Sequence, residues 1–79
     1  MSLSSLEAQL TRLEEAYVIA ADAWRMAVRH SDNVNLSQWH LSVEDHEELV
    51  EIVARAKARA VGLEARIREV ERQIESANS

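Results

Sequence analysis

The feature that most constrains the fold of this chain is the apolar segment from Ala16 to Val28, AYVIAADAWRMAV, which only Asp22 and Arg25 interrupt. A helix over this segment would be hydrophobic around nearly its whole circumference, and such a helix must be covered on several sides. One partner helix in the same chain covers only one of those sides. The segment therefore predicts either self-association or a bound partner.

Size and composition point to an all-α chain. At 79 residues the core of a single small domain is marginal unless disulfides, a metal or oligomerisation support it. The chain has no cysteine, which excludes disulfides and thiolate metal sites. Proline is also absent and Gly62 is the only glycine, so the turns of β-hairpins have almost no residues to form them. We expect helices supported by packing between chains.

A heptad pattern predicts the first helix over residues 4–31. Ser4 and Glu7 form an S-x-x-E capping box at its start. The polar segment SDNVN predicts its end, because such side chains compete for backbone hydrogen bonds. Its apolar positions alternate spacings of four and three, as in helices packed along one side. These positions are Leu6, Leu10, Leu13, Tyr17, Ala20, Trp24 and Ala27. Residues 32–41 are expected to form a short capped corner.

The same pattern predicts a second helix over residues 42–77. Ser42 is a suitable N-cap, because Glu44 and Asp45 then fall in the first turn and complement the helix dipole. The apolar positions of this helix are Leu49, Val53, Ala56, Ala60, Leu63, Ile67, Val70 and Ile74. Folding the chain near residue 38 brings the two patterns into one antiparallel register. The sequence therefore predicts a single helical hairpin over residues 1–79.

A lone hairpin leaves further apolar positions exposed to water. Pairing two hairpins into a four-helix bundle would bury them, so we predict a symmetric homodimer. The residues expected at the interface with a second copy or with another partner are Ile19, Ala23, Met26, Ala54, Ala58 and Val61. Val18, Ala21 and Val28 mark a third apolar side of the first helix. The alternative is a monomer in which the corner shields these positions.

Five acidic residues without a base between them form a candidate partner patch. They are Glu44, Asp45, Glu47, Glu48 and Glu51. Like charges four residues apart oppose helix stability, so this run either meets a basic partner or forms a solubilising face. The net charge of −5 opposes broad affinity for nucleic acids or anionic membranes.

Two kinds of site chemistry compete with an interaction role. Neutral imidazoles bind zinc, but the spacing of His30, His40 and His46 matches no recognised motif, so neither a metal nor a cofactor is predicted. No residue stands in a recognised nucleophile motif. The competing class is therefore a helical-bundle enzyme or ligand-binding protein whose inward-facing basic residues bind a carboxylate. The residues available for such a pocket are Arg25, Arg29, Arg55 and Lys57. In the simpler interpretation, Arg25 pairs with Asp22 on the same helix.

No apolar run reaches membrane-spanning length and the N-terminus lacks a signal peptide, so we expect a cytoplasmic protein. In length and expected hairpin topology the chain resembles the small helical chaperones that shield secretion-needle subunits, and short phage-encoded inhibitors. The predicted function is a non-catalytic interaction module that homodimerises and binds another protein, of adaptor, chaperone or inhibitor type. The competing prediction is an enzyme or ligand-binding protein with two or more arginines directed into an open pocket.

Overall fold

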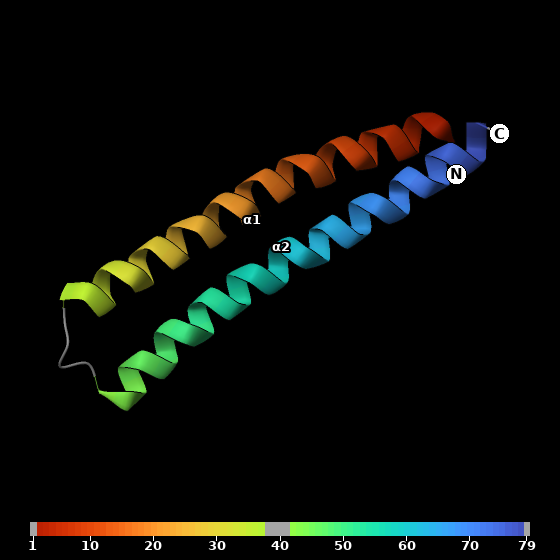
Figure 1. The fold of residues 1–79 in the computed structure, drawn as a ribbon. Helices are drawn as coiled ribbons and strands as arrows, with labels where there is room; N and C mark the ends of the chain where they lie inside the picture. Colours follow the sequence, from red (N-terminus) through yellow and green to blue (C-terminus); the bar gives the residue numbers. More distant parts are fainter. Residues whose placement is uncertain (1, 38–41, 79) are drawn as a thin grey trace.

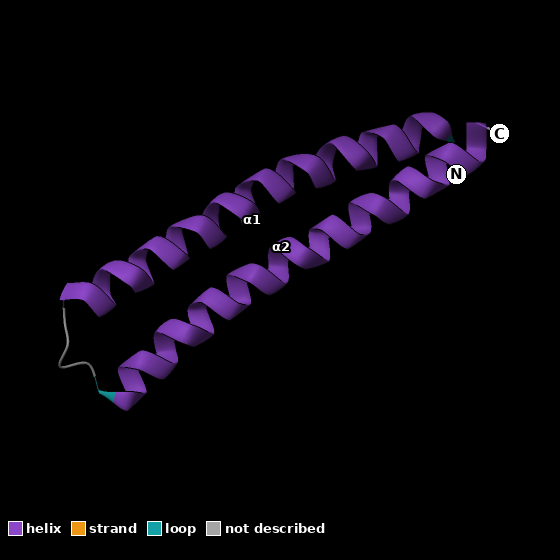
Figure 2. Ribbon diagram, in the orientation of Figure 1, coloured by secondary structure: helices purple, strands orange, loops and turns teal. Residues whose placement is uncertain are grey.

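The computed structural model describes residues 2–37 and 42–78, which form two long antiparallel helices (Figure 1). The first, α1, spans Leu3–Ser37, and the second, α2, spans Val43–Asn78. Apart from Ser2 and Ser42, every described residue is helical (Figure 2). Both chain ends lie at the same end of the molecule. The prediction of an all-helical chain with two helices packed against each other is confirmed.

The hairpin is a rod. The Cα atoms extend 58 × 16 × 14 Å and have a radius of gyration of 17.6 Å. A compact domain of this length would have a radius of gyration of about 12 Å. Because the rod is only two helices thick, each helix buries just the side that faces the other helix.

Ser42 caps α2 as predicted. Its hydroxyl oxygen accepts a hydrogen bond from the backbone N–H of Asp45 at 3.1 Å, and its carbonyl oxygen accepts one from the N–H of His46 at 3.0 Å. Glu44 and Asp45 lie in the first turn of α2, where negative charge complements the helix dipole.

α1 begins earlier than predicted, with Ser2 instead of Ser4 as its N-cap. The hydroxyl oxygen of Ser2 accepts a hydrogen bond from the N–H of Ser5 at 3.2 Å, and its carbonyl oxygen accepts one from the N–H of Leu6 at 3.1 Å. Ser4 therefore lies inside the helix. Both serines can cap a helix. The capping box with Glu7 favours Ser4, but the cap at Ser2 lets the helix include Leu3.

α1 also ends later than predicted. It continues to Ser37, whereas the segment SDNVN predicted an end near residue 31 and a corner over 32–41. Polar residues in a helix cost at most about 0.7 kcal/mol each relative to alanine. Val34 meanwhile extends the apolar contact line of α1 and lies beside Leu49 and Ile52 of α2, where all three line one hollow. The apolar contacts of Val34 with α2 thus stabilise this part of α1 by more than the low helix propensity of its polar residues destabilises it. The predicted corner residues 38–41 lie outside the described residues.

The buried core lies toward the chain ends. Leu6, Leu13 and Val70 form a buried cluster. The partly buried residues packed against it are Leu10, Leu63, Ile67 and Ile74. Ala20 and Ala60 are the buried residues farthest from the chain ends, and no described residue between them in the sequence is buried. In the half of the hairpin nearest the connection between the helices, none of the described residues 21–34 and 42–59 is therefore buried. We call this half the corner half.

We expect Leu13→Ala to lower the free energy of unfolding by about 2–5 kcal/mol, because it leaves a cavity in the buried cluster. Leu3→Ala is the matched control: Leu3 lies on the same helix but its side chain is 37% exposed, against 8% for Leu13. The control should lose less than half as much stability. Urea denaturation followed by circular dichroism measures both losses, and equal losses would contradict this location of the core.

Candidate interaction surface

Exposed apolar side chains gather in the corner half. The exposed large hydrophobic residues in the described part of the chain are Leu3, Val18, Ile19, Met26, Val28, Val43, Val50, Ile52 and Val61. All except Leu3 fall between residues 18 and 61, where Ala20 and Ala60 are the only buried residues among those described. Both findings have one cause: α2 does not enclose the apolar circumference of α1.

All six residues predicted at an interface are exposed in the hairpin. Ile19 is 69% exposed, Met26 58% and Val61 50%. The three alanines of the set, Ala23, Ala54 and Ala58, are exposed as well. None of the six lies in the contact line between α1 and α2, so a single hairpin leaves the whole set in contact with water.

Helical periodicity sorts the residues beside the α1–α2 contact line into two strips on each helix, one on each side of that line, because residues three and four apart share a face. On α1 the first strip is Ile19, Ala23, Met26 and His30, and the second is Val18, Ala21, Arg25, Val28 and Asp32. On α2 the first strip is Asp45, Glu48, Ile52, Arg55 and Arg59, and the second is Val43, Glu47, Val50, Ala54, Lys57 and Val61.

A hollow between the helices shows which strips share a face of the hairpin. His30 of the first α1 strip lines this hollow together with Asp45 and Ile52 of the first α2 strip. The two first strips therefore lie side by side, and we call this surface the Met26 face. The two second strips then share the opposite surface, which we call the valine face.

The six predicted residues do not form one patch. Ile19, Ala23 and Met26 lie on the Met26 face, whereas Ala54 and Val61 lie on the valine face. Ala58 follows neither strip and points away from α1. Sequence reasoning missed Val43 and Val50, although their spacing of seven residues was a readable signal.

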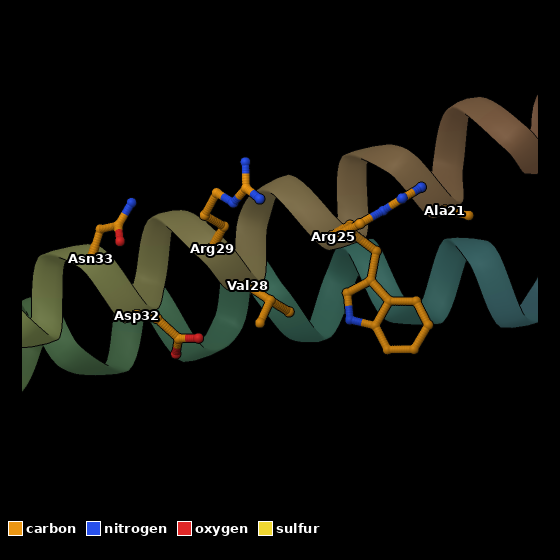
Figure 3. A pocket seen from close by; sticks show the side chains of 7 residues that line it. Ala21, Arg25, Val28, Arg29, Asp32 and Asn33 are labelled. Carbon is orange, nitrogen blue, oxygen red and sulfur yellow. The ribbon is translucent and has the colours of Figure 1, made fainter.

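Arg25 and Arg29 line a hollow on α1, and every described residue around it belongs to that one helix (Figure 3). Arg29 extends from one edge of α1 and Val28 from the other, so the hollow is an open surface feature, not an enclosed pocket. Arg25 forms the predicted intrahelical pair with Asp22, at 3.6 Å between guanidinium and carboxylate.

The other two basic residues considered for a pocket lie elsewhere. Arg55 is on the Met26 face and is paired with Glu51 of its own helix. Lys57 is on the valine face and is exposed. The four basic residues therefore do not converge on one cavity, as recognition of a carboxylate ligand requires.

The acidic run is spread around the first turns of α2. All five acids are exposed. Asp45 and Glu48 lie on the Met26 face and Glu47 on the valine face, while Glu44 and Glu51 lie on the outer surface of α2. The run surrounds the start of the helix and does not form a single-sided patch.

Within residues 2–37 and 42–78, no group of three His, Cys, Asp or Glu side chains is placed to hold a metal ion. His40, one of the three histidines considered, lies outside those ranges. Neither α1 nor α2 contains a stretch long and apolar enough to span a bilayer.

No protein-family model, curated protein or solved structure matches this chain.

Charge pairs stabilise the half of α2 near the chain end. Arg68 donates a hydrogen bond to the Glu64 carboxylate at 2.6 Å, and Arg72 donates one to Glu69. The hydrogen bond from Arg72 lowers the pKa of Glu69 below its ordinary 4.5, aided by a hydrogen bond from Gln73 and by the positive charge of Arg72. Because that pKa is lowered on folding, the pair stabilises the fold above pH 4.5, and its contribution is lost as pH falls through the lowered value.

Arg72→Gln should raise the pKa of Glu69 toward 4.5, since it removes the largest cause of the shift. Carboxyl-carbon NMR titration measures this pKa directly. Arg55→Gln, which removes an equivalent pair far along the same helix, serves as the control and should leave Glu69 unchanged. A Glu69 pKa that does not respond to Arg72→Gln would show that the pair does not persist in solution.

Proposed function

We propose that this chain is a non-catalytic interaction module, a helical hairpin that pairs with a second copy into a four-helix bundle and binds another protein through its remaining apolar surface. One observation carries the proposal: among the described residues, every exposed large hydrophobic residue but Leu3 lies between residues 18 and 61, where only Ala20 and Ala60 are buried. Clustered apolar exposure of this kind marks interaction sites on soluble proteins.

The free energy gained by burying this surface is comparable to the binding free energy of a stable complex. Eight exposed Val, Ile and Met side chains lie between residues 18 and 61. Because these residues lie on two opposite faces, one partner covers at most five of them. Fully burying one such side chain contributes about 1.5–3 kcal/mol, so completing the burial of five half-buried ones yields several kcal/mol per chain. A micromolar complex requires about 8 kcal/mol in total. Two copies together supply that amount before the costs of association are subtracted.

The small core supports the same proposal. The buried hydrophobic residues in the described ranges are Leu6, Leu13, Ala20, Ala60 and Val70, two of which are alanines. Chains of this size without disulfides or structural metals commonly gain their stability by oligomerising. A second hairpin would add apolar contacts in the half that lacks them.

The competing function, an enzyme or ligand-binding protein, has less support. Its basic residues lie on different faces: Arg25 and Arg29 border an open hollow on α1, while Arg55 and Lys57 stand on opposite faces of α2. A carboxylate substrate would meet at most two of them, both on one exposed helix.

Light scattering across a concentration series tests self-association. We expect the mass to rise to twice the 9.0 kDa of one chain, and the thermal midpoint of unfolding to rise with protein concentration. The dimer then serves as bait for a protein partner. A mass of 9.0 kDa at every concentration, with a constant midpoint, would refute the proposal.

A further inference from the structure

We infer that two copies pair through their valine faces with the two rods antiparallel, so that α1 of one protomer packs on α1 of the other and α2 packs on α2. In this orientation the two-fold axis lies in the interface and crosses both helices at right angles. The inference rests on the proposed function and specifies the surface and the orientation of its dimer. Four observations carry it: the composition of the two faces, the placement of the charges on the valine face, the hollow on α1, and the symmetry of the valine-face strip of α2.

The valine face is the more apolar of the two faces. It carries five exposed valines, and each of its strips contains only two charged residues. The α2 strip of the Met26 face, by contrast, contains four charged residues and one apolar residue, Ile52. Burying charges is costly unless each finds a partner. A second copy therefore covers the valine face at a lower cost in free energy than the Met26 face.

The four charges of the valine face are separated by sign along the rod. The two acids, Asp32 of α1 and Glu47 of α2, stand five and four residues from the ends of their helices at the connection. The two bases, Arg25 of α1 and Lys57 of α2, stand twelve and fourteen residues from the same ends. Negative charge therefore lies near the connection, and positive charge lies two to three helical turns farther from it.

Antiparallel rods bring these opposite charges together, whereas parallel rods do not. If two valine faces met with the rods parallel, α1 of each copy would pack on α2 of the other, and the connections would lie at the same end. Acids would then face acids and bases would face bases, and like charges facing each other oppose association. In the antiparallel orientation, Arg25 meets Asp32 of the second copy, and Glu47 meets Lys57 of the second copy.

Three of these four charges have no ion-pair partner in their own hairpin. Within the described part of the chain, Asp32, Glu47 and Lys57 form no salt bridge. Arg25 pairs with Asp22 at 3.6 Å, but the two side chains are 75% and 66% exposed, and such exposed pairs contribute little. All four charges are therefore available to a second copy.

On α1 the antiparallel pairing centres on a hollow. A helix that packs on an antiparallel copy of itself sets each residue against the one equally far beyond the two-fold axis. The midpoint between Arg25 and Asp32 lies half a residue beyond Val28, so this pair places the axis beside Val28. That position is near the middle of the hollow on α1, whose described lining residues run from Ala21 to Asn33 of that one helix (Figure 3). Val28 of each copy then enters the hollow of the other, as side chains do in helical bundles.

On α2 the strip of the valine face is symmetric about residue 52. Each member has a complementary side chain at the same distance on the other side. The pairs are Val50 with Ala54, Glu47 with Lys57, and Val43 with Val61. A second copy whose axis crosses α2 at residue 52 therefore joins apolar residues to apolar residues and acids to bases.

The two helices must place this axis at one level of the rod, and the hollow on the Met26 face agrees with this requirement. At its end farther from the connection, that hollow is lined by His30 of α1 and Ile52 of α2, which therefore lie close to the same level. The axis position beside Val28 is within two residues of His30, at most about 3 Å along a helix. Side chains accommodate an offset of this size, so one axis serves both pairings.

The extent of the pairing agrees with the burial pattern. The exposed large hydrophobic residues of α2 run from Val43 to Val61, and the antiparallel pairing matches these two ends to each other. The half of the hairpin near the chain ends has its own buried cluster. It therefore projects from each end of the dimer as a two-helix hairpin that no second copy covers.

Engineered cysteines test the orientation, since the chain has none of its own. In Val43→Cys/Val61→Cys the two cysteines of one chain stand on the same helix about 27 Å apart, whereas a disulfide requires Cα atoms within about 7 Å. Any disulfide must therefore join two copies. At a concentration where the protein is dimeric, we expect most of the mildly oxidised protein to run as a covalent dimer on a non-reducing gel.

Two kinds of control separate this pairing from chance collision. Val43→Cys and Val61→Cys alone should stay uncrosslinked, because the antiparallel pairing holds each position about 27 Å from its own copy. Val43→Cys/Gly62→Cys moves one cysteine by a single residue, out of the valine face, and should also stay uncrosslinked. Gly62 suits this control, because a Cβ atom added there has open space around it.

Charge exchange tests the pairing independently of any cysteine. Glu47→Lys and Lys57→Glu should each lower the dimer association constant by at least about 10-fold, because like charges then face each other at two places. Glu47→Lys also makes the net charge of −5 less negative, which by itself would favour association, so a loss reports on the local pair. An equimolar mixture of the two variants should regain the association, since both pairs then join opposite charges. Arg59→Glu, on the Met26 face, makes the same charge change as Lys57→Glu and should have no such effect.

The outcomes separate this inference from the proposed function. A dimeric mass without the Val43–Val61 crosslink, or without recovery in the mixture of charge variants, would overturn the antiparallel valine-face dimer while self-association stands. Equal crosslinking of the Gly62→Cys control or of the single-cysteine variants would overturn it as well. A monomer at every concentration would overturn both the dimer and the proposed function.

Discussion

The structure depends on a mismatch between how much of α1 is apolar and how much of it α2 can cover. A two-helix rod lets each helix bury one side. Between Ala16 and Val28, however, α1 is apolar on several sides, and Val18, Ile19 and Met26 remain exposed in the hairpin. Because the hydrophobic effect scales with apolar area removed from water, this remaining surface is the largest unused source of stability in the molecule.

The two halves of the rod differ in how they satisfy that constraint. Near the chain ends, leucine and isoleucine fill the contact line, and ion pairs such as Glu64–Arg68 occupy the outside. In the corner half the buried residues are replaced by partly exposed ones, and the outside carries valines. The half near the chain ends is an antiparallel helix pair with its own buried core. The corner half carries apolar residues on its outer sides, as if a second pair of helices were to cover them. We propose that this layer is a second copy.

The sequence predicted the parts of the fold that depend on the spacing of apolar residues, and it failed at both ends of α1, where local signals compete with other contacts. The alternation of apolar positions predicted both helices and their contact line. The capping box with Glu7 favoured Ser4, whereas the observed cap at Ser2 also brings Leu3 into the helix. The extension of α1 to Ser37 depends on the contact of Val34 with α2. A prediction from the polar residues of the segment SDNVN alone does not take this contact into account.

The candidate surface was predicted only in part. Ile19, Ala23 and Met26 were found because they stand in the apolar segment. Ala54 and Val61 lie on the opposite face. This could be decided only once the hollow at His30 showed which strip of α2 lies beside which strip of α1. Participation of any of these residues in an interface stays a prediction.

Small-angle X-ray scattering tests most directly whether a second copy covers the corner half. A lone hairpin is a rod 58 Å long with the same thin cross-section throughout. A second copy packed on the corner half would add a second pair of helices beside the first and make the particle thicker there. We expect the cross-section to increase with concentration. Scattering from a single thin rod of unchanged length at every concentration would contradict the account.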